Sequence, residues 1–295
     1  MTDQNESGII LKAQVTQIDL ATDIERAVTQ ALAEDVGSGD ATAALIPETS
    51  TAHARIVVRN ESVLCGTAWS DRVFRQLDHR IDIVWHAQDG DLVAENTVIC
   101  DLRGPARSLL TGERTALNFL QTLSAVATKT RTYVQAAAGT RAAILDTRKT
   151  LPGLRLALKY AVTAGGGVNH RTGLYDGILI KENHISAAGG ISRVLSDARK
   201  IGDEIPIQIE VETIDQLEQV LASGATLVLL DNFTIEDMAT AVKLTAGRAQ
   251  LEASGGITLR NVREIAETGV DRISIGTLTK DIQAVDLSMR FVSMA

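Results

Sequence analysis

From residue 140 onwards, short apolar runs alternate with segments that repeat apolar residues at helical spacing. The apolar runs are residues 142–145, 177–180, 207–211, 226–230, 250–253 and 272–275. The helical segments between them are residues 154–162, 191–201, 214–222, 235–246 and 259–268. Such alternation predicts a parallel sheet whose strands are buried on both faces. Six strands predict an incomplete α/β barrel, with a doubly wound open sheet as the alternative. No GxGxxG motif follows the first run, which argues against a dinucleotide-binding fold.

The first part of the chain has a different pattern. Residues 1–17 carry little signal, and we expect them to be loosely held. Helical spacing follows over 19–34 and 67–77, and strand-like alternation covers 54–66 and 81–104. A long helix is predicted over 112–139, ending near the first apolar run of the repeat. This order predicts an α+β block with antiparallel strands before the barrel.

Composition limits the classes of protein that remain. The 295 residues are 45% apolar and 22% charged, but only 3% aromatic, so Ala, Val, Ile and Leu must build the core. A net charge of -8 argues against a nucleic-acid binder. No apolar run is long enough for a membrane helix, and the polar, acidic start does not resemble a signal peptide. Cys65 and Cys100 are expected to be buried, reduced thiols, so the expected location is cytoplasmic.

Charged or glycine-rich residues stand at the end of every predicted barrel strand. In chain order they are Asp146, Thr147, Arg148 and Lys149; Lys181; Glu210; Asp231; Ser254, Gly255 and Gly256; and Gly276 and Thr277. His170 and Arg171 lie in the glycine-rich loop between the first two strands. Because the carboxyl ends of parallel strands share one edge of a barrel, these residues are expected to form a ring.

The residue types in this ring indicate an anionic ligand. The two glycine-rich ends can cradle a phosphate with backbone N–H groups. Glu210 and Asp231 are hard oxygen ligands that suit Mg²⁺ or ribose hydroxyls. Arg148, Lys149, Arg171 and Lys181, with His170, suit carboxylates and a pyrophosphate. We therefore expect a phosphorylated sugar and a second, carboxylated molecule.

One arginine and three histidines lie outside this ring. Arg114 falls in the first turn of the predicted long helix, where the helix dipole disfavours a cation. It is either a solvated side chain or an arginine directed at an anion. His53, His79 and His86 have no carboxylate or cysteine partner at ligand spacing, so we expect surface or packing residues.

A set of motifs in a fixed order gives the chain a family resemblance over nearly its whole length after residue 20. The motifs are EDVGSGDAT (34–42), ERTALNFLQ (113–121), DTRKTLPGLR (146–155), GGGVNHRTGLYDGILIKENH (165–184), IEVE (209–212), LLDN (229–232), ASGGI (253–257) and SIGTLT (274–279). Together they resemble quinolinate phosphoribosyltransferase. The resemblance implies an N-terminal open-faced α/β sandwich and a C-terminal incomplete α/β barrel with fewer than eight strands. The expected domains are residues 19–139 and 140–286, with the tail 287–295 packing back on the first.

The resemblance also implies a reaction. Quinolinate and phosphoribosyl pyrophosphate would give nicotinate mononucleotide, pyrophosphate and CO2, a step of NAD biosynthesis that uses magnesium. The residues implied in catalysis are Lys149, Lys181, Glu210 and Asp231. Those implied in substrate binding are Arg114, Thr147, Arg148, Lys149, His170, Arg171, Lys181, Glu210, Asp231, Ser254, Gly255, Gly256, Ile275, Gly276 and Thr277. Glu210 and Asp231 would hold Mg²⁺, directly or through substrate and water. A homodimer is implied, in which Arg114 reaches the partner's site.

Three alternatives remain at this point. A paralogue could act on another base, as in the homologue associated with molybdenum transport. A barrel of the aldolase type could use Lys181 as a Schiff-base lysine. A non-catalytic phosphosugar-binding protein would bind both ligands without turnover.

Overall fold

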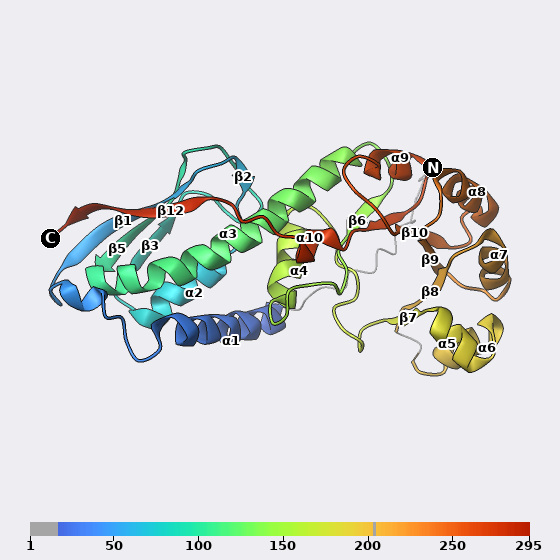
Figure 1. The fold of residues 1–295 in the computed structure, drawn as a ribbon, viewed down its shortest axis with the longest axis horizontal. Helices are drawn as coiled ribbons and strands as arrows, with labels where there is room; N and C mark the ends of the chain where they lie inside the picture. Colours follow the sequence, from blue (N-terminus) through green and yellow to red (C-terminus); the bar gives the residue numbers. More distant parts are fainter. Residues whose placement is uncertain (1–16, 203–204) are drawn as a thin grey trace, which may run out of the picture.

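The computed structural model describes residues 17–202 and 205–295, so the expectation for residues 1–16 lies outside the described part. The molecule is elongated, with an antiparallel sheet region at one end and a parallel sheet region at the other (Figure 1). The helix α3 runs from the first region into the second (Figure 1). In chain order the first region contains α1 (Gln17–Val36), η1 (Ala43–Leu45), β1 (Thr51–Val58), β2 (Ser62–Val63), α2 (Thr67–Leu77), β3 (Asp82–Trp85), β4 (Leu92–Val93), β5 (Val98–Pro105) and α3 (Ala106–Ala136).

The N-terminal sheet has the strand order β12-β1-β5-β3, and its pairs are antiparallel. Alternation along β1 explains its two faces, because Ala54 and Ile56 are fully buried whereas Arg55 between them is exposed. The helices α2 and α3 pack on each other and lie over one face of the sheet (Figure 1). The predicted open-faced sandwich is thus confirmed.

The outer face of this sheet places two of the three histidines beside a carboxylate. Asp101 on β5 accepts hydrogen bonds from the rings of His53 and His86, the latter at 2.6 Å from Nε2 to Oδ2, and from Arg55 Nε at 3.0 Å. Asp101 is 48 residues from His53 in the chain, and only the pairing of β1 with β5 brings them together. The two histidines are thus residues of the sheet surface that pack on Asp101, a partner that spacing along the chain did not show because the contact is made across strands.

The long helix begins earlier than predicted, at Ala106 directly after Pro105. Gly112, which looked like a start signal, lies inside α3 against α2. A Cβ on Gly112 would lie 2.8 Å from a ring carbon of Phe74, so glycine here allows two helices to approach closely. Arg114 is consequently the ninth residue of α3 and not in its first turn, and the helix-dipole argument for it fails.

The second region is a parallel sheet covered by helices. Its elements are β6 (Ala143–Leu145), α4 (Arg155–Ala164), β7 (Ile178–Ile180), α5 (Glu182–Ala188), α6 (Ile191–Arg199), β8 (Ile207–Val211), α7 (Ile214–Ala222), β9 (Leu227–Asp231), α8 (Ile235–Thr245), β10 (Gln250–Ser254), α9 (Val262–Glu267), β11 (Arg272–Ser274) and α10 (Thr277–Lys280). The strand order is β6-β11-β10-β9-β8-β7. This order follows the chain around a ring that stays open between β6 and β7. It confirms the incomplete barrel and excludes the doubly wound sheet, whose strand order reverses.

After α10 the polypeptide leaves the parallel sheet region, and its last strand belongs to the antiparallel sheet of the first region. β12 (Leu287–Met294) pairs antiparallel with β1, with Met289 opposite Ile56. It lies beside β1 along the side of the antiparallel sheet (Figure 1). Among the described residues, no helix is long and apolar enough to cross a membrane.

Candidate active site

A buried ion pair anchors the chain where β6 ends. Lys159 on α4 donates to Asp146 Oδ1 at 2.5 Å, and both side chains are fully buried. The same oxygen accepts the His170 backbone N–H at 2.9 Å, and Lys159 also donates to the His170 carbonyl at 2.8 Å. Burial raises the pKa of Asp146 to about 6, while Lys159 acts to lower it. The pair therefore clamps the segment around residue 170 to the end of β6 and has no free face for a ligand.

The segment 168–171 occupies the opening of the barrel beside β6. Val168 donates its N–H to the Ile144 carbonyl at 2.8 Å and forms an isolated parallel bridge with Leu145. This local pairing brings the Gly-rich loop, distant in the strand order, next to the loop that follows β6. The segment with His170 and Arg171 thereby lies beside the end of β6.

Arg148 and Arg171 lie on neighbouring loops, one after β6 and one before β7, and a third arginine donates to both loops. Arg148 and Arg171 are close enough for Arg148 to depress the pKa of Arg171, although burial is the larger cause. Arg171 donates to the Gly177 carbonyl at 2.8 Å. Arg148 Nε is buried and has no acceptor within the described chain. A buried guanidinium N–H without a partner beside a second cation favours binding of an anion such as a carboxylate.

Arg155 at the start of α4 braces the two loops that carry these arginines. It donates to Thr150 Oγ1 at 3.2 Å, to the Arg148 carbonyl at 3.3 Å and to the Thr172 carbonyl at 3.3 Å. Arg155 belongs to the motif DTRKTLPGLR but was not selected from the sequence. The structure places it behind the loops, where it supports them.

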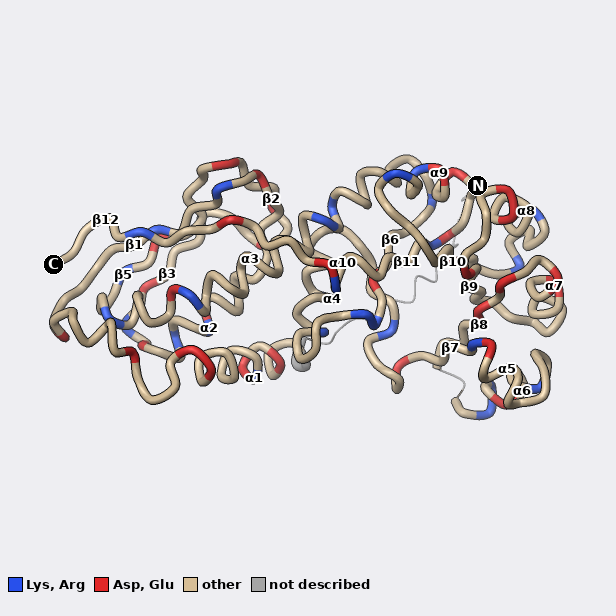
Figure 2. The backbone as a smooth tube through the Cα atoms, in the orientation of Figure 1, with Lys and Arg blue, Asp and Glu red and all other residues tan. Residues whose placement is uncertain are grey.

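A second cluster forms at the ends of β7, β8 and β9. Lys181 pairs with Glu210 at 2.5 Å, and Lys181 is half-exposed. The pKa of Asp231 is raised, first by burial and then by the nearby charge of Glu210, whereas Lys181 and Lys149 lower it. The structure thus brings Lys149, Lys181, Glu210 and Asp231 together. Figure 2 shows the Lys and Arg positions on the loops between α4 and β7 and acidic positions near β8 and β9.

The donor set in this cluster fits a metal ion only in part. Two carboxylates of hard oxygen character face one region, and one of them is already paired with Lys181. No group of three or more His, Cys, Asp or Glu residues with metal-binding geometry occurs among residues 17–202 and 205–295. These two carboxylates could hold a divalent cation only together with further oxygens from a substrate or water.

The two glycine-rich strand ends pack against polar side chains. Gly255 has φ +96°, and a Cβ there would lie 2.1 Å from Asn232 Oδ1. A Cβ on Gly276 would lie 3.2 Å from Lys149 Cδ and 3.6 Å from Thr147 Oγ1. Ile275 is buried, and its N–H donates to the Leu145 carbonyl at 2.9 Å. Glycine is needed at 255, where the left-handed backbone and Asn232 leave no room for a side chain, whereas a Cβ at 276 would press only on the flexible Lys149 side chain.

Arg114 is the predicted site residue that the structure does not bring to the strand ends. It is exposed, and its neighbour Thr115 donates to Asp35 on α1 at 3.2 Å. No hydrogen bond or ion pair of Arg114 connects it to another described residue. Within one chain it therefore lies with the N-terminal region.

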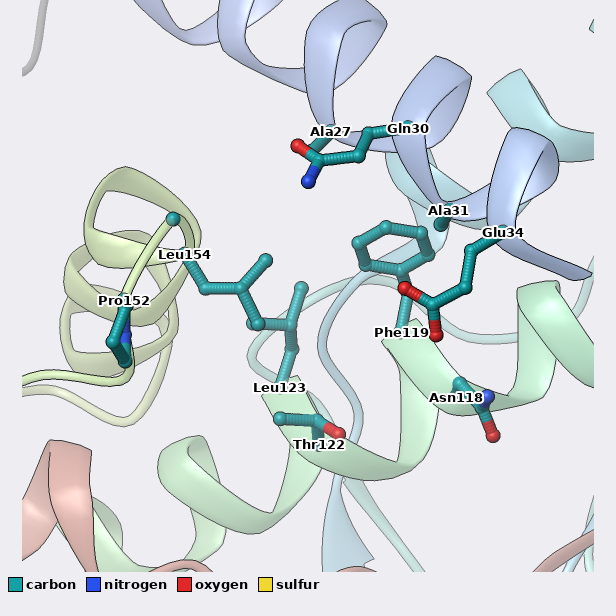
Figure 3. Close-up of a pocket in the computed structure, with 11 residues that line it drawn as sticks. Ala27, Gln30, Ala31, Glu34, Asn118, Phe119, Thr122, Leu123, Pro152 and Leu154 are labelled. Carbon is teal, nitrogen blue, oxygen red and sulfur yellow. The ribbon is translucent and has the colours of Figure 1, made fainter.

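A cavity of about 280 Å³ lies between α1, α3 and the part of the loop before α4 that follows Arg148 and Lys149 (Figure 3). Its lining is mostly apolar, with Phe119, Leu123 and Leu154 directed toward the space (Figure 3). Glu34 is its one ionisable lining residue in the described chain, and no lysine or arginine lines it. This lining does not suit a polyanion.

Three buried polar residues near the site were not selected from the sequence. Lys159 interrupts an apolar helix, and Gln208 and Glu252 lie within buried strands. Gln208 and Glu252 have the same parity along their strands as the site residues Glu210 and Ser254, which places each pair on one face. Their spacing of two residues from Glu210 and Ser254 was the feature of the sequence that could have identified them.

Comparison with known proteins gives a consistent result. The family model described as "Quinolinate phosphoribosyl transferase, C-terminal domain" matches residues 126–290, and the corresponding N-terminal domain model matches residues 40–124. A Bacillus subtilis protein described as a probable nicotinate-nucleotide pyrophosphorylase [carboxylating] is 44% identical over 87% of this chain and 89% of its own length. A chloroplastic nicotinate-nucleotide pyrophosphorylase [carboxylating] of Oryza sativa is 37% identical, over 91% of this chain and 77% of its own. The structure of the nicotinate-nucleotide pyrophosphorylase from Francisella tularensis superimposes with a TM-score of 0.90 at 45% identity, covering 92% of this chain and 96% of that one.

Proposed function

The chain belongs to the quinolinate phosphoribosyltransferase family, and from this premise we propose that it converts quinolinate and phosphoribosyl pyrophosphate to nicotinate mononucleotide, pyrophosphate and CO2. The structural observation that carries the proposal is the buried, unpartnered Nε of Arg148, on a loop that Arg155 joins to the loop of Arg171. A pyridine with two neighbouring carboxylates presents the anionic groups that two such arginines bind.

The first chemical step needs positioning more than proton transfer. The ring nitrogen of quinolinate carries a lone pair, so it attacks C1 of the ribose without a general base. The C1–N bond forms while the C1–O bond to pyrophosphate breaks, and the electron pair leaves with the pyrophosphate. Arg148 and Arg171 hold the carboxylates so that the nitrogen faces C1.

The second cluster acts on the ribose and the leaving group. Lys149 and Lys181 stabilise the negative charge that develops on pyrophosphate, and Glu210 and Asp231 favour an oxocarbenium-like ribose and bind its hydroxyls. Mg²⁺, when bound with the substrate, supplies further charge neutralisation at the phosphates. Thr147, Ser254, Gly255 and Gly256, with Ile275, Gly276 and Thr277, are proposed to hold the 5′-phosphate and pyrophosphate. The Ile275 N–H is already used by Leu145, so it contributes shape instead of a donor.

Decarboxylation follows from the charge on the product ring. Alkylation of the nitrogen makes the ring cationic, and this charge stabilises the electron pair left when the adjacent carboxylate departs as CO2. Lys149 or Lys181 then stabilises or protonates the ring carbon. Lys181 forms an ion pair with Glu210, and a Schiff-base lysine reacts as an uncharged amine, so this pair argues against an aldolase-type reaction.

We further propose a homodimer in which Arg114 reaches the partner's strand ends. Its exposure, and its position far from the strand ends of its own chain, support this role. Two free, buried thiols, Cys65 and Cys100, support the cytoplasm as the compartment.

The test is product formation with Mg²⁺ and phosphoribosyl pyrophosphate, with quinolinate in one reaction and nicotinate in a parallel one. Nicotinate mononucleotide from quinolinate alone supports both the reaction and the dicarboxylate preference. Product from nicotinate alone would overturn the substrate but keep phosphoribosyl transfer. Lys149→Ala and Arg171→Ala should each lose at least about a hundredfold in kcat/KM. Wild-type activity in either variant, with the fold intact, contradicts the site.

A further inference from the structure

A buried chain of polar groups lies directly behind Arg171. The Arg171 backbone N–H donates to His170 Nδ1 at 2.7 Å, and His170 Nε2 is 2.9 Å from Gln208 Oε1. Gln208 Nε2 in turn donates to Glu252 Oε2 at 3.0 Å. Gln208 is 5% exposed and Glu252 is 1% exposed. This series of hydrogen bonds therefore runs from the loop that carries Arg171, through Gln208 on β8, to Glu252 on β10, inside the barrel.

The direction of every hydrogen bond in this chain follows from its two ends. A backbone N–H can only donate, so His170 Nδ1 must accept and carries no proton. The proton of the neutral ring is then on Nε2, which donates to the amide oxygen of Gln208. The amide NH2 must consequently face Glu252, and an ionised carboxylate can only accept. The backbone N–H at one end and the carboxylate at the other require the same donor and acceptor roles. Every hydrogen bond in the series therefore has one defined direction.

This polarity determines the charge of His170. Protonation of Nδ1 would place an N–H of the ring against the Arg171 N–H at 2.7 Å, with no acceptor between them. His170 is accordingly neutral, with both ring nitrogens used by the protein. It contributes no positive charge to the cationic loops, in contrast to the four Lys and Arg residues of the ring.

We propose that Glu252 is a positioning residue for Arg171, acting through Gln208 and His170. The proposal rests on the proposed function, in which Arg171 binds a substrate carboxylate. Because Glu252 can only accept, it prevents the Gln208 amide from turning over, and this keeps the acceptor nitrogen of His170 directed at Arg171. Glu252 Oε1 accepts no hydrogen bond within the described chain, but it lies 3.6 Å from His170 Nε2. One carboxylate oxygen of Glu252 thus accepts the hydrogen bond from Gln208. The negative charge of the other oxygen stabilises the proton on His170 Nε2.

The first test needs no turnover. The imidazole nitrogens of ¹⁵N-histidine-labelled protein are observed by NMR, and the His170 signals are identified by their loss in His170→Gln. We expect a neutral ring with the proton on Nε2 at neutral pH. An imidazolium, or a proton on Nδ1, overturns the proposal whatever the enzyme's substrate is.

The second test removes the carboxylate in two ways. Glu252→Leu leaves the Gln208 amide free to turn, so we expect a mixture of His170 tautomers. The KM for quinolinate should rise about tenfold, the value of one lost hydrogen bond, with kcat changed less than about twofold. The isosteric Glu252→Gln keeps an acceptor and should limit the rise in KM to under about threefold. The KM for phosphoribosyl pyrophosphate should stay constant in both.

Gln250→Leu is the matched control, because Gln250 lies on the same face of β10 two residues before Glu252. It should leave the His170 signals and the KM for quinolinate unchanged. Glu252→Gln should show a smaller share of the second His170 tautomer, because its amide can present either an oxygen or an NH2 group to Gln208, and this share decides if Glu252→Leu does not fold. Unchanged His170 signals and KM in the folded Glu252 variants overturn the proposal. Absence of turnover in the wild type would instead overturn the proposed function, and the NMR result would still decide the hydrogen-bond chain.

Discussion

Two lysine–carboxylate pairs in the parallel sheet region join the same kinds of atom at the same distance of 2.5 Å. Lys159 and Asp146 lie between α4 and β6 and are both fully buried, whereas Lys181 is 50% exposed and Glu210 is 12% exposed. The buried pair has its remaining hydrogen bonds satisfied by the segment around His170. The open pair has solvent on one side and Asp231 on the other. Equal geometry therefore serves two purposes: one pair holds a loop in place, and the other remains available for a ligand.

The largest expected effect comes from breaking the buried pair. Lys159→Met should lower the free energy of unfolding by about 3–5 kcal/mol, because it leaves the Asp146 charge buried and uncompensated. The double variant Lys159→Met with Asp146→Asn should recover part of this loss. Urea unfolding measures both. Equal stability of Lys159→Met and the wild type would mean that the pair does not hold the loop.

The pH dependence of this variant sharpens the test. Burial already raises the pKa of Asp146 from its usual 3.8 to about 6 in the presence of Lys159, and loss of Lys159 raises it further. A folded-state pKa above the unfolded value means that folding takes up a proton, so the penalty is relieved as the pH falls through the folded pKa. The loss of stability should thus be larger near about pH 8 than near about pH 5.

The open pair should respond in the opposite way. Lys181→Met should change the free energy of unfolding by less than about 1 kcal/mol, because the lysine is half-exposed. The kcat/KM should nevertheless fall at least about a hundredfold, or about 2.7 kcal/mol, because Lys181 is proposed to stabilise the leaving group. Urea unfolding and steady-state kinetics on one preparation make the comparison. A stability loss as large as that of Lys159→Met would remove the distinction between the two pairs.

Arg114 tests whether the open region is completed by a second copy. An Arg114→Ala protomer mixed with a Lys181→Met protomer should regain about one quarter of wild-type activity, since half of the dimers are mixed and each has one intact site. Each variant alone should be nearly inactive. Verified mixed dimers without activity would argue against a shared site.

The smallest effect is expected at the two thiols, which extend the buried region into the N-terminal domain. Burial raises the pKa of both Cys65 and Cys100, with the charge of Asp89 adding to the effect at Cys65. Neither should form a thiolate near neutral pH, so iodoacetamide should modify neither thiol in the folded protein and both in denaturant. Mass spectrometry counts the modified cysteines. Rapid alkylation of the native protein would show that this region opens.

The sequence was sufficient for features that depend on local periodicity. The strand over 207–211 and the helices over 67–77 and 214–222 were predicted with the bounds they have in the structure. The ring of charges followed from the rule that parallel strands share one edge. Residues that act across the sheet were missed: Asp101 meets His53 only through strand pairing, and Glu252 reaches His170 through Gln208 and directly at 3.6 Å. The start of α3 was predicted too late because of Gly112. In the sequence, a glycine that allows two helices to pack closely cannot be told from a glycine at a helix boundary.

The pairing of β12 with β1 has a consequence for folding during synthesis on the ribosome. β1 begins at Thr51, and its neighbour on one side begins at Leu287, so the edge of β1 stays uncovered while the ribosome makes the whole barrel. An uncovered strand edge is a template for pairing with another chain. The nascent N-terminal region is consequently most exposed to aggregation during synthesis, and the last few residues of the chain close that edge.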